Sequence, residues 1–240
     1  MAGETIKTEA ICLDVRPWSR TSHIVSWLTP DGQVSTVVKG AVRPKSFFLG
    51  QYDLNQTCEI LYYARAKNGV HALRECALVC ARDQLRNNCR ALCLASYFRK
   101  LVSDLAPMGV ECRPWYELLS RALSALRADV SFLVRFELDI LRLAGLSPDF
   151  SGYDRLRDWS MFSIESGVFF EGAARFVRVS REVAAWLDAG APKTKNEQIP
   201  LDAARVIGVF YQFHLDCAAD VRRSVLGMLL NKTGRLYENE

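Results

Sequence analysis

A three-residue turn, Pro30-Asp31-Gly32, lies between two runs that are rich in β-branched residues. Proline fixes its own backbone φ angle and glycine accepts a positive one, so this tripeptide favours a reversal of the chain. The flanking runs alternate apolar and polar side chains, as half-buried strands do. The sequence therefore predicts a β-hairpin within residues 15–49, and this hairpin commits the N-terminal part of the chain to a sheet.

Further strand-like segments accompany the hairpin. Residues 5–16 alternate with apolar side chains on both faces, and residues 57–63 and 70–79 are separated by a second turn signal, Lys67-Asn68-Gly69. Five short strands within about 80 residues fit a small closed barrel. We therefore expect a barrel domain over residues 1–80.

The pattern changes after the barrel. From Arg82 onward, apolar residues recur every three or four positions, which is the period of an amphipathic helix. Glycines and prolines interrupt residues 146–179, which predicts an irregular insert that contains a hairpin. The fold class is therefore α+β, with a mainly α-helical domain over residues 81–240 that includes the insert. The expected helices cover residues 82–105, 115–126, 130–144, a short helix capped by Ser180 and ending at Leu187, and one long helix over 202–230.

The chain has 240 residues, a net charge of +4 and 50% hydrophobic residues, which is an ordinary globular composition. It contains no run of about 18 apolar residues, and its N-terminus lacks the basic and apolar regions of a signal peptide. We therefore expect a soluble, cytoplasmic protein with no membrane partner.

The eight cysteines are best explained as small, buried apolar side chains, since a cytosolic chain of this length needs no disulfides. Two pairs have the spacing C-x3-C, namely Cys76 with Cys80 and Cys89 with Cys93. These pairs leave a zinc site, or an enzyme that uses a thiol or a metal, as an alternative.

Motifs of the common catalytic sites are missing from the sequence. The three histidines, His23, His71 and His214, belong to no metal-ligand or triad pattern. A glycine-rich phosphate loop, a G-x-S-x-G elbow and an H-E-x-x-H motif are also absent. We therefore expect a protein that is not an enzyme and needs no cofactor or metal.

Positive charge is concentrated in three stretches without an acidic residue: residues 33–51, 84–103 and 221–237. Such stretches are expected where a protein binds phosphates, although solvated surface faces show the same pattern. The candidate DNA-binding residues are Arg20, Lys39, Arg43, Lys45 and Phe47 near the hairpin, and Arg86, Arg90, Arg222 and Arg223 in the helical part.

The aromatic residues of the barrel region have two interpretations. Phe47, Phe48 and Tyr52 are favoured for stacking on unpaired bases, because they are adjacent to the basic loop. Rings on or beside the expected strands more often belong to a core, although they could also serve as stacking platforms: Trp18, Trp27, Tyr62 and Tyr63.

Two long segments resemble the RecO family of bacterial DNA repair and recombination proteins. They are ICLDVRPWSRTSHIVSWLTPDGQVSTVVKGAVRPKS at residues 11–46 and LVRFELDILRLAGLSPDF at residues 133–150. The VRRSVL segment at residues 221–226 extends the resemblance over nearly the whole chain. The N-terminal part of that family is an OB-fold, so the resemblance implies an OB-fold for the expected barrel.

The resemblance implies a recombination mediator that binds single- and double-stranded DNA and anneals complementary strands without nucleotide hydrolysis. It also implies association with RecR, with the C-terminal tail of single-strand binding protein (SSB) and with the bacterial nucleoid, and help in loading RecA onto SSB-coated DNA. Lys39 and Arg43 fall in the family's K-G-A-x-R pattern, with Lys45 as a neighbour. The alternative is a barrel protein that binds structured RNA, since it would share the charge pattern.

The R-F-E-L segment resembles the part of the family's helical domain that receives the acidic, Phe-ended tail of SSB. Arg135 is therefore the candidate for pairing with the carboxylates of that tail. The alternative is that Arg135 pairs with Asp139 on its own helix.

Many relatives carry a four-cysteine zinc module after the Leu-x-Pro-Asp segment. No cysteine occurs here between Cys112 and Cys217, so we expect no zinc at residues 151–176. Packing of aromatic side chains is expected in its place, by Tyr153, Trp159, Phe162 and Phe169.

Overall fold

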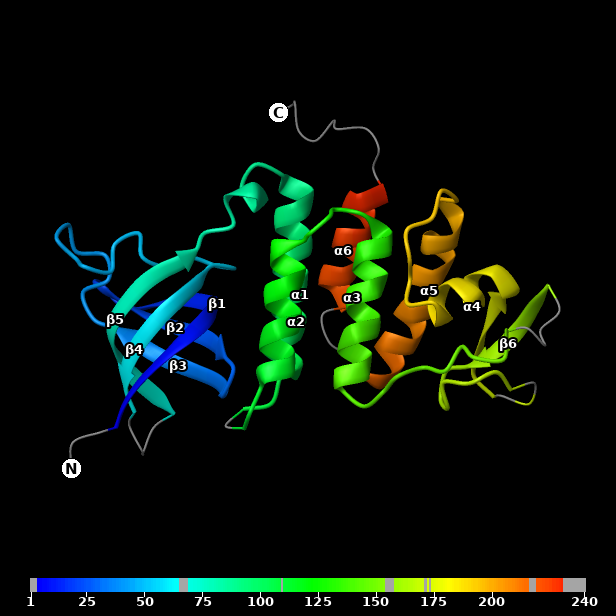
Figure 1. The fold of residues 1–240 in the computed structure, drawn as a ribbon, viewed down its shortest axis with the longest axis horizontal. Helices are drawn as coiled ribbons and strands as arrows, with labels where there is room; N and C mark the ends of the chain where they lie inside the picture. The colour runs from blue at the N-terminus through cyan, green and yellow to red at the C-terminus, as the bar shows by residue number, and fades with distance from the viewer. Residues whose placement is uncertain are drawn as a thin grey trace. The chain divides into compact units, whose positions relative to one another are not determined.

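The computed structural model of the protein describes residues 4–64, 69–108, 110–153, 158–170, 172, 174–215 and 219–230. The chain divides into two compact units, the barrel unit (Met1–Ala125) and the helical unit (Leu126–Glu240). In Figure 1 the barrel unit runs from blue to green and the helical unit from green to red. No helix of the described residues is long and apolar enough to cross a membrane.

The barrel unit begins with a closed five-stranded barrel in the order β1-β2-β3-β5-β4. Neighbouring strands are antiparallel except β3 and β5, which are parallel. This barrel confirms the expected OB-fold. Its strands are β1 (Thr5–Ser19), β2 (Ser22–Thr29), β3 (Gly32–Val38), β4 (Thr57–Tyr63) and β5 (Val70–Cys80).

The first predicted turn joins β2 to β3. Thr29 Oγ1 donates to the carbonyl oxygen of Gly32 over 2.8 Å and accepts from the N–H of Asp31 over 3.2 Å. The second predicted turn, Lys67-Asn68-Gly69, lies partly outside the described residues.

Strand β1 is buried on both faces, which explains its apolar pattern. Ala10 and Cys12 belong to the barrel interior together with Trp27. Ile11 alternates to the opposite face and is also fully buried, since helix α1 (Cys89–Leu105) packs against β1.

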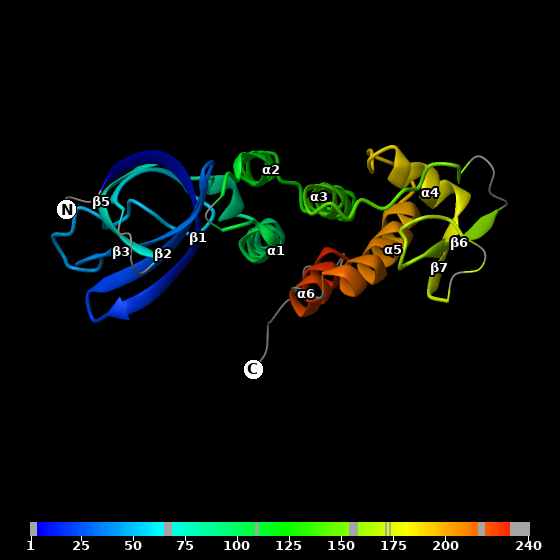
Figure 2. The ribbon, with the colours of Figure 1, turned by 90° about the horizontal axis from the view of Figure 1, so that it is seen from below.

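Helix α1 and helix α2 (Arg113–Ser124) complete the barrel unit, and both are seen end-on in Figure 2. The Gln33 side chain on β3 donates to the carbonyl oxygens of Ser103 and Ala106 at the end of α1, over 3.2 and 2.8 Å. Helices α1 and α2 therefore belong to the same compact unit as the barrel. The sequence had instead predicted that they belong to a helical domain over residues 81–240.

Helix α1 begins later than its apolar period predicts. Arg82 has a left-handed backbone conformation, with φ at +52°, and a short 3-10 turn, η1 (Asp83–Leu85), follows it. The Arg82 side chain is buried and donates to the carbonyl oxygen of Asn55 over 2.7 Å and to Ser120 Oγ over 3.4 Å. These contacts hold the connection between barrel and helix in an irregular conformation.

The described part of the helical unit contains four α-helices and a two-stranded sheet. Asp129 caps α3 by accepting from the N–H of Phe132 over 2.8 Å. Ser180 caps α4 in the same way through the N–H of Val183, over 3.3 Å, as predicted. The elements are α3 (Val130–Leu143), β6 (Trp159–Ser163), β7 (Phe176–Ser180), α4 (Arg181–Asp188), α5 (Gln198–His214) and α6 (Ala219–Leu230).

The prediction of one long helix over residues 202–230 is wrong, because α5 ends at His214 and α6 begins at Ala219. The expected apolar stripe is therefore broken: Phe210 is buried, but Phe213 is 42% exposed and Val221 is 39% exposed.

Aromatic rings form the core of the insert. Phe150 stacks on Phe162 with centroids 4.6 Å apart, and Phe169 meets Phe162 edge-on at 5.4 Å. Gly167, with φ at +68°, lets the chain pass close to Phe210, since a Cβ there would lie 3.2 Å from that ring. The predicted packing is thus confirmed for Phe162 and Phe169, but wrong for Trp159, which is 48% exposed.

Candidate nucleic-acid interface

One end of the barrel carries a hollow of about 350 Å³. It lies where β1 ends, β2 begins and β3 ends, so segments distant in the sequence contribute to it. Its lining residues are Trp18, Ser19, Thr21, Ser22, Val37, Lys39, Gly40 and Arg43.

Trp18 reaches the hollow because β1 is irregular near its end. The pairing of β1 with β2 shifts register between Pro17 and Ser19, as in a β-bulge. Proline has no N–H to donate to the neighbouring strand, so it favours such an irregularity. Trp18 is therefore turned toward solvent and is 63% exposed.

The loop that follows β3 is held by backbone contacts. The N–H of Gly40 donates to Ser22 Oγ over 3.3 Å, and the N–H of Val42 donates to the carbonyl oxygen of Thr21 over 3.3 Å. Gly40 has φ at +70°, and a Cβ at this position would lie 3.3 Å from Cδ of Arg43. Glycine therefore permits the turn that places Arg43 beside the hollow.

Four exposed cations surround this end of the barrel, and no acidic side chain pairs with them among the residues that the structure describes. Several exposed cations elsewhere in the barrel unit do pair, for example Lys7 with Glu59 at 2.8 Å and Arg86 with Asp53 at 3.0 Å. The unpaired set keeps its full positive charge for an external anion. It consists of Arg20, Lys39, Arg43 and Lys45.

The rings near the loop separate into contact and core positions. Phe47 is 95% exposed, whereas Phe48 and Tyr52 pack against the barrel core. The Tyr52 hydroxyl lies 2.8 Å from Nδ1 of His23, and its ring meets Trp27 edge-on at 5.9 Å. Phe47 therefore remains a candidate for base stacking, and Phe48 and Tyr52 have structural roles.

Trp18 was expected among the strand rings and not among the candidate DNA-binding residues, yet it lines the hollow. Of that group, Trp27 and Tyr62 are core residues with at most 5% exposure. The informative signal was Pro17, which marks an irregular strand position immediately before the ring.

Three further candidate DNA-binding residues lie outside the loop, near the start of α1 and on α6, and they differ from the loop cations in their partners or their exposure. Arg86 is exposed, but it pairs with Asp53 at 3.0 Å. Arg90 is half-buried at the start of α1. On α6, Arg223 is highly exposed and lies 3.6 Å from Asp220.

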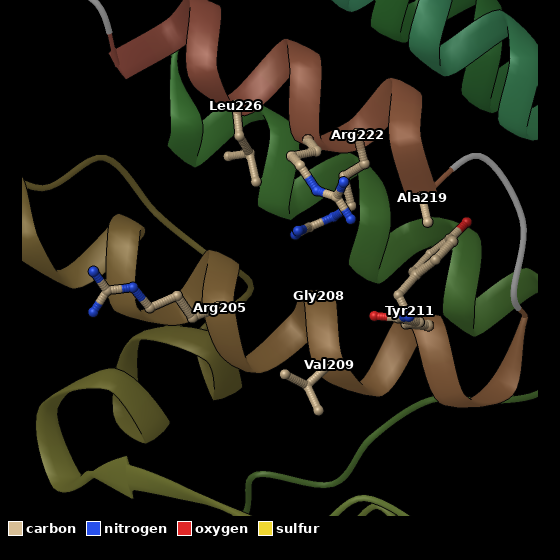
Figure 3. A pocket seen from close by; sticks show the side chains of 9 residues that line it. Arg205, Gly208, Val209, Tyr211, Ala219, Arg222 and Leu226 are labelled. Carbon is tan, nitrogen blue, oxygen red and sulfur yellow. The ribbon is translucent and has the colours of Figure 1, made fainter.

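Arg222 does not belong to a DNA-binding surface, contrary to the prediction. Its side chain is only 12% exposed, and its Nε and Nη2 donate to Oε1 and Oε2 of the fully buried Glu137 over 2.7 and 2.9 Å. Nη2 also donates to the carbonyl oxygen of Ala204 over 2.8 Å. Figure 3 shows Arg222 reaching from α6 toward Gly208 on α5, where a Cβ would overlap Nη1. Arg222 thus joins α3, α5 and α6.

Arg135 is half-buried and donates to the carbonyl oxygen of Ala191 over 2.6 Å. Its alternative partner, Asp139, pairs instead with Arg142 at 2.7 Å. Arg135 does not line the hollow of about 700 Å³ at the start of α3. That hollow is lined by apolar residues, among them Val130, Pro200, Leu201, Leu229 and Leu230, together with Arg127, Asp129, Lys193 and Glu197.

The cysteines take several environments. Cys12, Cys58 and Cys112 are buried as expected, and burial raises the pKa of the Cys12 thiol. Cys89 is exposed, which corrects the expectation of general burial, and Cys217 lies outside the described residues. In the described part of the chain, no cluster of three or more His, Cys, Asp or Glu side chains has metal-binding geometry.

Comparison with known proteins gives consistent matches. Residues 1–82 match the family Recombination protein O N terminal, and residues 86–152 match Recombination protein O C terminal. A DNA repair protein RecO of Exiguobacterium sp. is 26% identical over 170 residues, which cover 68% of each chain. A DNA repair protein RecO of Rhodopirellula baltica is 31% identical over 150 residues, which cover 58% of this chain and 53% of the relative.

Proposed function

Because the chain belongs to the RecO family of DNA repair and recombination proteins, we propose that it binds single- and double-stranded DNA and anneals complementary strands. It acts as a binding protein and not as an enzyme. The observation that carries the proposal is the hollow at the end of the barrel, where Trp18 adjoins Lys39 and Arg43. Cations without acidic partners bind phosphates, and an exposed ring stacks on a base of any sequence.

Annealing requires two polyanions to approach each other. Their mutual repulsion falls when a protein neutralises phosphates and releases the bound counterions. Lys39 and Arg43 in the hollow, together with Arg20 and Lys45 in the adjoining turn and loop, can hold a strand through its backbone and leave most base edges free for pairing. Binding without base-edge contacts also fits a protein that must accept any sequence.

The annealing prediction concerns two cations of the hollow. Lys39→Ala combined with Arg43→Ala should slow the annealing of complementary oligonucleotides, because the strands lose two phosphate contacts. The annealing of the two labelled strands is measured by fluorescence energy transfer, with no nucleoside triphosphate added. The matched control is Lys7→Ala with Arg74→Ala, since these exposed cations of the same unit already pair with Glu59 and Glu75.

Annealing at the parent rate in the Lys39→Ala, Arg43→Ala chain would remove the hollow from the mechanism. The alternative function, binding of structured RNA, is separated by competition. A DNA mediator should release labelled single-stranded DNA to unlabelled DNA more readily than to a structured RNA of equal length.

The same proposal includes partners. As a mediator the protein associates with RecR and helps to load RecA onto SSB-coated DNA, and it binds the acidic, Phe-ended tail of SSB. The large hollow at the start of α3 supports the last of these, because its apolar walls suit a phenylalanine ring and the exposed Lys193 suits a carboxylate. Arg135 stays a second candidate for the carboxylates, with its guanidinium partly engaged by Ala191.

Titration of a labelled tail peptide tests the partner site. Lys193→Ala and Leu201→Ala should each weaken the peptide if the hollow binds it, whereas Arg135→Ala should do so if Arg135 binds the carboxylates. Arg142→Ala is the control, since Arg142 is exposed and pairs with Asp139. Equal affinity for the parent and all three variants would refute both sites.

A further inference from the structure

The outer face of the β6–β7 hairpin carries exposed rings and a cation. Trp159 pairs with Ser180 and Met161 pairs with Arg178, so these side chains share one face with Phe176. Trp159 is 48% exposed and Phe176 is 43% exposed. The opposite face is covered, because Phe162 and Val179 are buried toward the aromatic core of the insert. The exposed rings are thus the consequence of strand alternation and not of poor packing.

Arg178 is held against the larger ring. Its guanidinium carbon lies 4.4 Å from the centroid of Trp159. A guanidinium stacked on a ring keeps its N–H groups directed outward in its own plane, where they can donate to an anion. No acidic side chain pairs with Arg178 within the described ranges, so its charge is not neutralised locally.

A hollow of about 300 Å³ adjoins this stack, and Trp159, Arg178 and Arg205 contribute to its lining. Arg205 is 77% exposed and lies 3.1 Å from Asp202. Asp202 also lines the hollow and neutralises Arg205, so Arg178 is the cation that remains for a phosphate, and the hollow gives a base or sugar space beside the ring. This combination of ring, cation and space is the arrangement that single-stranded nucleic acids require.

We propose that this hairpin face is a second site for single-stranded nucleic acid, at which a base stacks on Trp159 or Phe176 while Arg178 donates to a phosphate. The proposal rests on the proposed function and adds a strand-binding site in the helical unit. A duplex is not the ligand, because its bases are stacked on each other and not available to a ring.

A site of this kind deepens the account of annealing. The barrel hollow and the hairpin face lie in different units, so each can hold a strand through its own contacts. Both sites contact the phosphates and the flat faces of the bases, and neither contacts the base edges. Neither therefore competes with the hydrogen bonds that the two strands form with each other.

Affinity for a labelled oligothymidylate is measured on the full chain that carries Lys39→Ala and Arg43→Ala, so that the barrel contribution is reduced. In this background, Trp159→Leu should weaken binding about fivefold or more, because leucine keeps apolar bulk but offers no ring face. Arg178→Lys should weaken it less than Arg178→Ala, since lysine keeps the charge but not the planar stack.

Phe213→Leu is the matched control. Phe213 is 42% exposed on α5 and has Arg175 over its ring at 5.4 Å, so it is a similar ring and cation pair outside the hairpin face. Unchanged affinity in the Trp159→Leu and Arg178→Ala chains would overturn the hairpin site and leave the barrel site standing. Loss of affinity in Trp159→Leu and Phe213→Leu alike would also overturn it, because the effect would not be specific to this face.

Photocrosslinking of the parent chain gives a readout that needs no variant. An oligonucleotide with 5-iodouracil crosslinks to rings that stack on its bases, and the modified peptides are identified by mass spectrometry. Crosslinks at Trp159 or Phe176 support the proposal. Crosslinks confined to the barrel unit overturn it, and failure of the parent chain to bind any oligonucleotide overturns the proposed function as well.

Discussion

A buried ion pair joins one residue of the R-F-E-L segment to one residue of the V-R-R-S-V-L segment. Glu137 of the first and Arg222 of the second form a buried ion pair across 85 positions of sequence. A carboxylate with no exposed surface is strongly destabilising unless a cation and hydrogen bonds compensate it. Both segments were recognised by their resemblance to the family. Arg222 was nevertheless predicted to bind DNA, because the charge of a residue does not reveal a buried partner that is distant in the sequence.

This pair gives a stability prediction. Arg222→Ala should lower the free energy of unfolding by about 3–5 kcal/mol, because the buried carboxylate of Glu137 would lose the guanidinium that neutralises it. The adjacent Arg223 is the control, since Arg223→Ala removes an exposed cation and should change stability by no more than about 0.5 kcal/mol. Chemical denaturation measures both. Similar values for the two variants would contradict the structural role of Arg222.

At the scale of elements, periodicity predicted the regular segments and missed the interruptions. Strand β4 has its predicted bounds, Thr57–Tyr63, because turn signals flank an alternating run. The break between α5 and α6 carries no glycine or proline, so an apolar period continued through it. Trp159 was assigned to a core with Phe162, yet positions three apart lie on opposite faces of a strand. Applying the strand period to the insert would have placed Trp159 outside.

The cap of α4 tests the local argument. Ser180→Ala should lower the free energy of unfolding by about 1 kcal/mol, because the N–H of Val183 loses its acceptor. Ser180→Asp should restore most of that loss, since aspartate is also a good N-cap. Thermal or chemical denaturation compares the three chains. A stability of Ser180→Ala equal to the parent would show that the cap contributes nothing.

At the scale of the whole molecule, the sequence predicted the architecture and part of the nucleic-acid site. The strand pattern gave the barrel, and the acid-free loop gave Lys39, Arg43 and Lys45, which the structure shows to be exposed. Trp18 and the hairpin face required the structure, because a bulge and a strand register decide which rings face solvent. The division into units also differed, since side-chain contacts such as those of Gln33 determine that α1 joins the barrel.

The salt dependence of single-strand binding tests the central claim most directly. The logarithm of the association constant falls linearly with the logarithm of salt concentration, with a slope of about 0.7 per phosphate neutralised. Replacing Lys39 and Arg43 by alanine should reduce that slope by about 1.4, whereas Lys7→Ala with Arg74→Ala should leave it unchanged. If the slopes of the parent and the Lys39→Ala, Arg43→Ala chain are equal, the barrel loop does not hold the DNA backbone.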